Sequence, residues 1–391
     1  MPAERVLTGQ AMQSPSSRLL SALLEAERAL GRLAEAMQDP VRRGRLWADA
    51  ARRDACAAAR LDGVAVDPTD FLIATVSPDL VPHAGRGTAQ SVRSLWQGAL
   101  FTQGRLAAPA RRMSRPSPPR SGGAAADAWR AVAELEADMA DLSRFDREED
   151  TFDGVPSEGM DAEAPAPWSL GWLESLWRCL QAEISGRDPG RLVFSAERET
   201  EASALLARIE AAGEEPAMLG AVGMLAGLLR PAPDLRTPGW AVAPARLMAA
   251  LAVGRNCRAS NVWLPMAAAL QTDRTTAQIA ARGRDEDWRV WLAEMVAEAA
   301  RRERQRAAAL DQAAETWRRR VGLRRRNSRL PEVMDGLFEE PAFTVRHIQK
   351  RLGTTFRGAQ LLVDELEEAA IVREVTNRAL DRVFVAVDLM P

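Results

Sequence analysis

The chain has 391 residues, of which 47% are hydrophobic and 27% are charged, a composition typical of globular proteins. At roughly 150 residues per domain, this length predicts two or three domains. The sequence has no run of about 18 apolar residues to span a membrane, and its first residues lack the basic start and apolar centre of a secretory signal. We therefore expect a cytoplasmic protein with no membrane partner.

The formal net charge is only -2, but the charge is unevenly distributed. Residues 131–163 contain 12 acidic and 2 basic side chains, whereas residues 301–330 contain 11 basic and 3 acidic ones. Such asymmetry predicts segments with different partners. Lys350 is the only lysine and tyrosine is absent. This bias is typical of GC-rich coding, so arginine enrichment alone does not indicate phosphate binding.

Few residues are available for metal or histidine chemistry. The three cysteines are far apart with no CxxC pair, and His83 and His347 are the only histidines. A His/Cys metal cage is therefore not expected, and an odd number of cysteines argues against a disulfide framework. No Gly-rich phosphate loop of Walker or Rossmann form is present. We predict no catalytic residue, no metal and no cofactor.

Alanine and leucine recur at i, i+3 and i+4 over most of the chain, which predicts a mainly α-helical protein. We expect the first helix to be capped by Ser14 and Pro15. The expected helices span residues 16–37, 40–61, 88–106, 168–183, 195–212, 216–229, 244–253, 263–270, 276–281 and 285–320, with a short element opening at Pro68 and an acidic helix at 128–143.

A proline- and glycine-rich stretch interrupts this pattern at residues 107–126, and acidic, Pro/Gly-dotted sequence continues to residue 167. Such a composition predicts a flexible linker. We therefore expect four regions: an N-terminal helical region (1–106), the linker (107–167), a central helical core (168–320) and a C-terminal module (327–391).

The C-terminal module has the pattern of a winged helix-turn-helix. A helix is expected at 329–339, a second helix capped by Thr344 and ended by Gly353, and a third helix capped by Thr355 and running to residue 369. Residues 371–375 and 382–386 then read as two strands of a hairpin. A short β-hairpin after the third helix is a wing.

The third helix of such a module enters the major groove of double-stranded DNA, where its first turns reach the base edges. Arg357 can fork onto guanine and Gln360 can pair with adenine. The full predicted DNA surface comprises base-facing Thr354, Thr355, Arg357 and Gln360; phosphate-binding Arg346, Lys350 and Arg351; Arg378 and Arg382 of the wing; and Arg324, Arg325, Arg326 and Arg329. Because the far end of this helix is acidic, a module that only contacts protein remains an alternative.

Upstream of the module, the chain resembles bacterial Fic-like proteins, which carry a C-terminal winged helix after a long helix. The resemblance rests on Trp288, Trp291 and Leu292 followed by residues 298–306, on residues 25–33, and on ACAAARLDGVAVDPTDFL at 55–72. In autoinhibited members of the family, Ser or Thr is followed four residues later by Glu and then Gly; the corresponding residues here are Ala58, Asp62 and Gly63. The resemblance implies a Fic-like helical body.

The family's catalytic loop reads His-x-Phe-x-(Asp/Glu)-Gly-Asn-Gly-Arg. Its His deprotonates the target hydroxyl, its acidic residue holds magnesium and its turn binds nucleotide phosphates. The corresponding stretch here, residues 228–251, contains no His. Asp234 and Gly239 do not match the motif's arrangement, while Arg246 takes the place of the Arg that begins the next helix. We therefore expect a catalytically degenerate body and no enzyme activity of the family's kind.

These patterns together favour a sequence-specific DNA-binding protein, most simply a transcriptional regulator. A two-fold homodimer would place two recognition helices one DNA turn apart. Two alternatives stay open: a divergent nucleotidyl or phosphoryl transferase with a rebuilt loop, and a non-catalytic, antitoxin-like partner of another protein.

Overall fold

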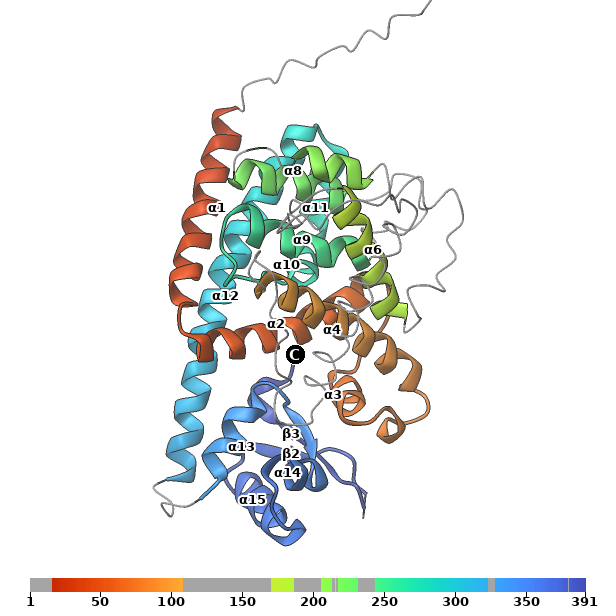
Figure 1. Cartoon of the computed structure of the whole chain (residues 1–391), viewed down its shortest axis with the longest axis vertical. Coiled ribbons are helices and arrows are strands. Elements are labelled where there is room, and N and C mark those ends of the chain that lie inside the picture. Colours follow the sequence, from red (N-terminus) through yellow and green to blue (C-terminus); the bar gives the residue numbers. More distant parts are fainter. Residues whose placement is uncertain are drawn as a thin grey trace, which may run out of the picture.

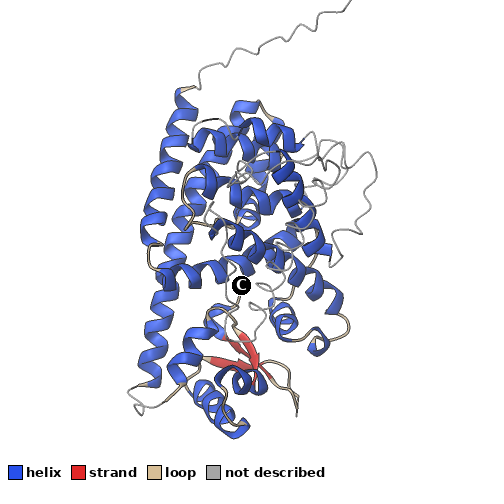
Figure 2. Cartoon of the chain, viewed as in Figure 1, coloured by secondary structure: helices blue, strands red, loops and turns tan. Residues whose placement is uncertain are grey.

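The computed structural model describes residues 16–107, 170–185, 205–212, 215, 217–230, 243–322, 328–378 and 380–391. Over these ranges the protein is mainly α-helical with one small antiparallel sheet near its C-terminus, which confirms the predicted fold class (Figures 1 and 2). Nearly all of the expected linker, with the acidic helix at 128–143, lies outside the described residues.

The N-terminal helices begin at polar caps that satisfy their first backbone N–H groups. Ser16, Asp39 and Asp67 each accept such a bond. The cap of the first helix is thus Ser16, and the expected Ser14 cap is wrong. This part of the chain comprises α1 (Ser17–Ala36), α2 (Pro40–Leu61), α3 (Pro68–Val76), the 3-10 turn η1 (Pro78–Leu80) and α4 (Arg86–Ala107).

Where they are described, the central helices lie close to their predicted ranges; residues 195–204 of the helix expected at 195–212 lie outside the described part. The largest differences are three residues: the helix expected at 263–270 begins at Met266, after Pro265, and the one expected at 244–253 continues to Asn256. The described elements are α6 (Leu170–Ser185), a helical segment at 205–212, α8 (Ala217–Leu229), α9 (Ala243–Asn256), α10 (Met266–Thr272), α11 (Arg274–Arg282) and the long α12 (Asp285–Val321).

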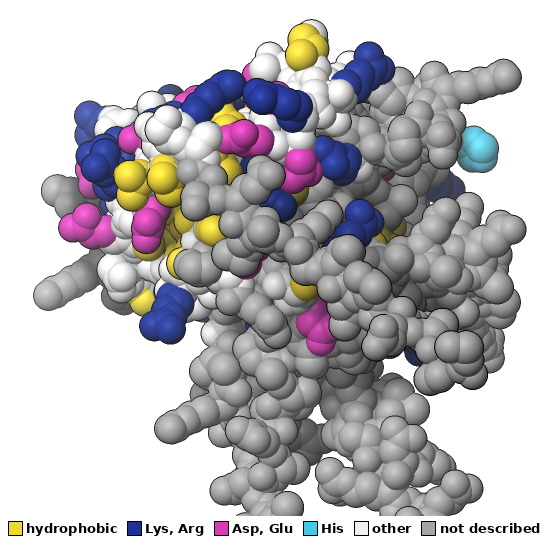
Figure 3. Space-filling model, turned by 90° about the horizontal axis from the view of Figure 1, so that it is seen from above, with side chains coloured by type: hydrophobic (Ala, Val, Ile, Leu, Met, Phe, Trp, Pro, Cys, Tyr) yellow, Lys and Arg dark blue, Asp and Glu magenta, His cyan; other side chains and the backbone are white. Residues whose placement is uncertain are grey.

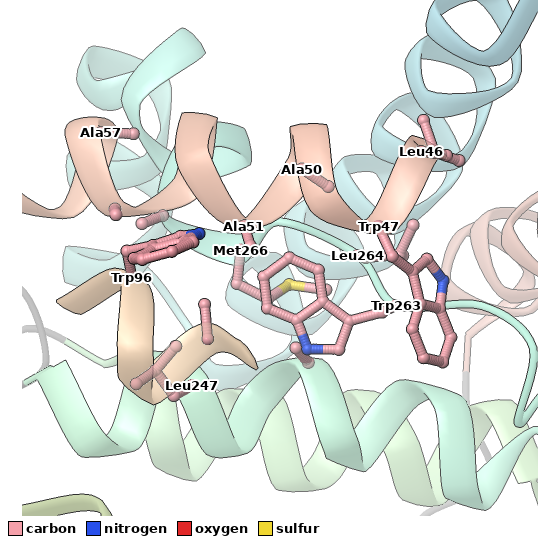
Figure 4. Close-up of a cluster of buried hydrophobic side chains, with 14 of the residues drawn as sticks. Leu46, Trp47, Ala50, Ala51, Ala57, Trp96, Leu247, Trp263, Leu264 and Met266 are labelled. Atoms are coloured by element: carbon pink, nitrogen blue, oxygen red, sulfur yellow. The ribbon is translucent and has the colours of Figure 1, made fainter. Parts of the chain in front are cut away.

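Helices from the N-terminal and central parts of the chain share one core. α1 lies along α12 (Figure 1), and α2 packs on α4, α10 and α12. Between α2 and α9, Trp47, Trp96 and Trp263 are buried together (Figure 4). The indole Nε1 of Trp263 donates to Oγ1 of Thr102 at 3.0 Å, so this cluster includes one buried hydrogen bond. The predicted boundaries between regions are not tested by this packing and stay predictions.

The C-terminal module contains three helices and a three-stranded sheet in the order β1-β3-β2. Strand β1 was not predicted from the sequence; it pairs antiparallel with β3 and places Phe343 opposite Phe384 with ring centroids 5.9 Å apart. Its elements are α13 (Leu330–Leu337), β1 (Ala342–Thr344), α14 (Val345–Leu352), α15 (Phe356–Glu368), β2 (Val372–Glu374), β3 (Val383–Ala386) and the 3-10 turn η3 (Val387–Leu389).

A buried arginine connects this module to the helical body, which comprises the helices α1 to α12. Arg52 of α2 is 1% exposed, and its guanidinium donates to the carbonyl oxygens of Phe338 and Glu339 at 3.0 Å each. These carbonyls follow the end of α13, where backbone acceptors lack partners within the helix. Burial, with the cations of Arg306 and Arg53 nearby, lowers the pKa of Arg52 to about 10, so it remains charged at neutral pH.

An ionic cluster between α2 and α12 lies beside Arg52, and its Asp49 carboxylate favours the charged form of that arginine. Asp49 accepts from Arg53 at 2.7 Å and from Arg306 at 2.6 and 3.0 Å, and Arg53 in turn bonds Glu303 at 2.7 and 2.9 Å. Burial alone would raise the pKa of Asp49, but the hydrogen bond from Arg306 and the nearby cations lower it to about 2. The carboxylate is therefore ionised and fully hydrogen-bonded, as a buried charge requires.

Aromatic and cation–π contacts also connect the C-terminal module to α2 and α12. Trp317 of α12 packs on Phe338 with ring centroids 4.9 Å apart and donates its indole N–H to Asp388 at 2.8 Å. The guanidinium of Arg45 lies 4.6 Å from the Phe338 ring and pairs with Asp335 at 2.9 Å. Because Phe338 contacts the body from both sides, the module is fixed to α2 and α12.

We predict that Asp49→Asn strongly destabilises the protein, because it removes a buried carboxylate that is bonded to the half-buried guanidinium groups of Arg53 and Arg306. Removing one partner of a buried ion pair costs about 3–5 kcal/mol. Urea unfolding at pH 7 measures the change in the free energy of unfolding. Glu25→Gln is the control: it breaks the Arg301 pair, in which both side chains are about half exposed, at a cost of about 1 kcal/mol or less. Equal losses would contradict the role of the cluster.

We also predict a pH dependence from Asp54, which is buried and accepts from the backbone N–H groups of Ala267 and Ala268 at 2.7 and 3.1 Å. Burial raises its pKa from 3.8 to about 6, despite these two hydrogen bonds. Between these pH values the folded state holds a proton that the unfolded chain releases, so this group lowers the free energy of unfolding as pH rises from about 4 to about 6. Asp54→Asn should flatten that part of the stability curve in urea titrations; an unchanged slope would disprove the assignment.

Candidate nucleic-acid interface

The turn between α14 and α15 is built by residues that the sequence indicated. Thr344 caps α14 by accepting from the N–H of His347, and Gly353 ends it in the left-handed conformation at φ 59°. That conformation favours glycine. Thr355 then caps α15, accepting from the N–H of Gly358 at 3.1 Å. These caps confirm the expected boundaries of both helices.

The outer face of α15 is open to solvent. Its inner side chains, Ala359, Val363 and Leu366, are buried against α14 and β2. On the other side, Phe356 and Leu361 are 50% and 49% exposed, and Figure 1 shows α15 at the end of the molecule away from the helical body. A helix placed in this way can approach a DNA duplex without moving the module.

The four residues expected to face bases differ in their solvent exposure and in their hydrogen bonds within the protein. Arg357 is exposed and has no hydrogen bond or ion pair within the described part of the chain. Gln360 is half-buried, and its amide donates to Asp364 at 2.6 Å. The hydroxyl of Thr355 accepts a capping bond, and Thr354 is half-buried. Arg357 is therefore the most available base-reading group of the four.

The three basic residues of α14 that we expected to contact phosphate differ in their exposure and packing. Lys350 is exposed, and the Arg346 side chain is 72% exposed with Asp381 at 3.9 Å. Arg351, in contrast, folds back over Gly336 of α13 and occupies the space that a side chain there would fill. We therefore retain Arg346 and Lys350 as predicted phosphate contacts, whereas Arg351 packs on its neighbouring helix.

The wing between β2 and β3 is held in shape by Thr376. Its hydroxyl donates to Glu374 at 2.6 Å and accepts from the N–H of Val383 at 3.1 Å. Arg378 is exposed on this turn, while the guanidinium of Arg382 lies 5.0 Å from the Phe384 ring. Thr376 was not among the predicted site residues, because its partners are identified only by the strand pairing.

Several basic residues near the module serve its structure. Arg329 donates to the carbonyl of Leu352 and to the Glu332 carboxylate, and Arg320 donates to the carbonyl of Ala370 at 3.1 Å. Arg329 thus binds the exposed end of α14, where carbonyl groups lack helical partners. Arg324, Arg325 and Arg326 lie outside the described residues.

The end of the body opposite the module carries a mixture of charged and apolar side chains among the described residues. Seen from above in Figure 3, its described side chains of both charge signs are interspersed with apolar ones. Within the described ranges, no group of three or more His, Cys, Asp and Glu side chains could hold a metal ion. No helix in this part of the chain is long and apolar enough to cross a membrane.

Comparison with known families agrees with this geometry. Residues 330–382 match a family described as "HTH DNA binding domain", a range that runs from α13 to the turn just before β3. The chain therefore carries a helix-turn-helix DNA-binding domain at its C-terminus. No curated protein matches the chain.

We predict that Arg357→Ala weakens binding to a preferred site by about 1–3 kcal/mol and relaxes the choice of base at one position, because a guanidinium that forks onto guanine is lost. Fluorescence anisotropy with a labelled duplex measures the dissociation constant. The matched control is Arg32→Ala, which removes an exposed arginine from α1. Equal affinities and base preferences for wild type and Arg357→Ala would place the DNA surface elsewhere.

Proposed function

We propose that this protein is a sequence-specific binder of double-stranded DNA that acts as a transcriptional regulator in the cytoplasm. The observation that carries the proposal is the exposed Arg357 in the first turn of α15, which has no partner among the described residues and belongs to a module that matches a DNA-binding family. The leading end of this helix also carries the positive end of the helix dipole. The acidic residues at 364–368 lie at the other end, away from the phosphates in this orientation.

A two-fold homodimer is part of this proposal. One module presents one recognition helix, and paired half-sites one DNA turn apart would engage two. The spacing between the two helices would depend on the body, because Arg52, Trp317 and Arg45 join the module to α2 and α12. A signal or partner protein that changes the body could therefore alter DNA affinity.

A Fic-like body that has lost its chemistry is the second part of the proposal. Asp62 and Arg246, which the resemblance places in two separate segments of the family, form an ion pair with two hydrogen bonds at 2.7 and 2.8 Å. Arg246 is fully buried in α9. This contact supports a shared arrangement of the two segments. Asp234 and Gly239 of the corresponding catalytic stretch lie outside the described residues.

A gel-shift titration tests the proposal. The full chain is incubated at low salt with fragments of its native genome and, separately, with a library of random duplexes from which bound DNA is recovered and sequenced. We expect retained fragments that share a short two-fold repeat. A folded protein that retains no duplex at low salt would exclude DNA binding.

We predict that Lys350→Ala weakens binding to all sequences by a similar factor, because an ammonium group on α14 would contact phosphate and not base edges. It should also reduce the slope of log affinity against log salt by about one unit, since one fewer counterion is released. Titrations at several salt concentrations with selected and unrelated duplexes measure both effects. A sequence-dependent loss would assign Lys350 to the bases.

A further inference from the structure

Two large apolar side chains are exposed on the part of α15 that leads toward DNA. Phe356 is the first residue of the helix, and Leu361 lies four residues after Arg357, so Arg357 and Leu361 share one face. The two side chains are 50% and 49% exposed. The module buries its other phenylalanines, Phe338, Phe343 and Phe384, to 1% exposure or less. The exposure of Phe356 therefore sets it apart from these buried phenylalanines.

The polar groups around these side chains are largely committed to the protein. The Thr355 hydroxyl accepts from the N–H of Gly358, and the Gln360 amide donates to Asp364. At the tip of the helix, the guanidinium of Arg357 has no hydrogen bond or ion pair with the described residues, and apolar Phe356 and Leu361 lie near it in the sequence. This surface suits two neighbouring base edges, one with a pair of acceptors and one with an apolar group.

In the major groove, the apolar group that a base presents is the 5-methyl of thymine, and side chains such as phenylalanine contact it. We propose that Phe356 and Leu361 read thymine 5-methyl groups beside the guanine bound by Arg357. The inference rests on the proposed function and makes it more specific, because it assigns the specificity of the site to methyl contacts in addition to hydrogen bonds. An adenine contact by Gln360 would require its bond to Asp364 to break.

The test removes single methyl groups from the DNA. A preferred duplex is first selected from the random library, and each thymine is then replaced in turn by deoxyuridine, which differs only in lacking the 5-methyl group. For wild type, we expect at least one replacement per half-site to raise the dissociation constant about fourfold. This factor corresponds to the free energy of burying one carbon group. Replacements outside the half-sites should have no effect.

Protein variants connect the effect to the two residues. Phe356→Ala and Leu361→Ala should each weaken binding to the thymine duplex, and at least one of them should bind the sensitive thymine and uracil duplexes equally well. Circular dichroism checks that the variants keep their helical content. The matched control is Ile279→Ala, which removes an apolar side chain that is 68% exposed on α11 of the body. It should keep the full fourfold discrimination.

The possible failures can be distinguished. If wild type binds selected DNA but tolerates uracil at every thymine, the methyl contacts are disproved while sequence-specific binding stands. The same holds if both alanine variants keep the discrimination of wild type. If the chain retains no duplex under any condition, the proposed function itself fails, and the inference fails with it.

Discussion

The buried guanidinium of Arg52 connects the two parts of this protein. It lies in α2 of the body, yet both of its bonded acceptors are backbone carbonyls that follow α13 of the DNA-binding module. An isolated arginine would not be stable in such a site, since burying an unpaired charge is very costly. The carboxylate of Asp49, which is ionised and held by Arg53 and Arg306, favours the charged form of Arg52 in this site.

The contacts of Arg52, Trp317 and Arg45 with the module also determine which of its sides remains accessible to DNA. Because α13 and Phe338 are fixed against α2 and α12, the opposite side of the module, formed by α15 and the wing, is left toward solvent. The large apolar side chains of the module are divided in the same way. Those at the contacts with α2 and α12 and between the sheet strands are buried, whereas those at the tip of α15 are exposed.

Hydrogen bonds inside the module reduce the number of basic side chains that are available to bind DNA. Arginine residues of similar sequence context make different contacts. Arg329 and Arg320 bind carbonyl groups and Arg351 packs on Gly336, whereas Arg357 has no partner in the described part of the chain. A guanidinium that satisfies a backbone acceptor is not readily released, because the acceptor would lose its partner. The number of basic residues therefore overstates the charge available to a phosphate backbone.

The sequence by itself determined the local elements of this protein. Helix boundaries at Asp39, Thr344, Thr355 and Gly353 follow from side-chain caps and a left-handed glycine, which act over four residues or fewer. The same local signals identified the recognition helix and placed Arg357 in its first turn. The helical fold class follows from the spacing of apolar residues, which is also a short-range property.

Only the tertiary structure decided the contacts between distant segments. Strand β1 forms because β3, about 40 residues later, offers it a partner, and three residues alone give no periodic signal. The bond from Arg52 to Glu339 spans 287 positions, and the roles of Arg329, Arg351 and Thr376 depend on carbonyls and strands that folding brings close. The type of a side chain determines which groups it can bond. Packing determines which partner it contacts and whether it remains available to DNA.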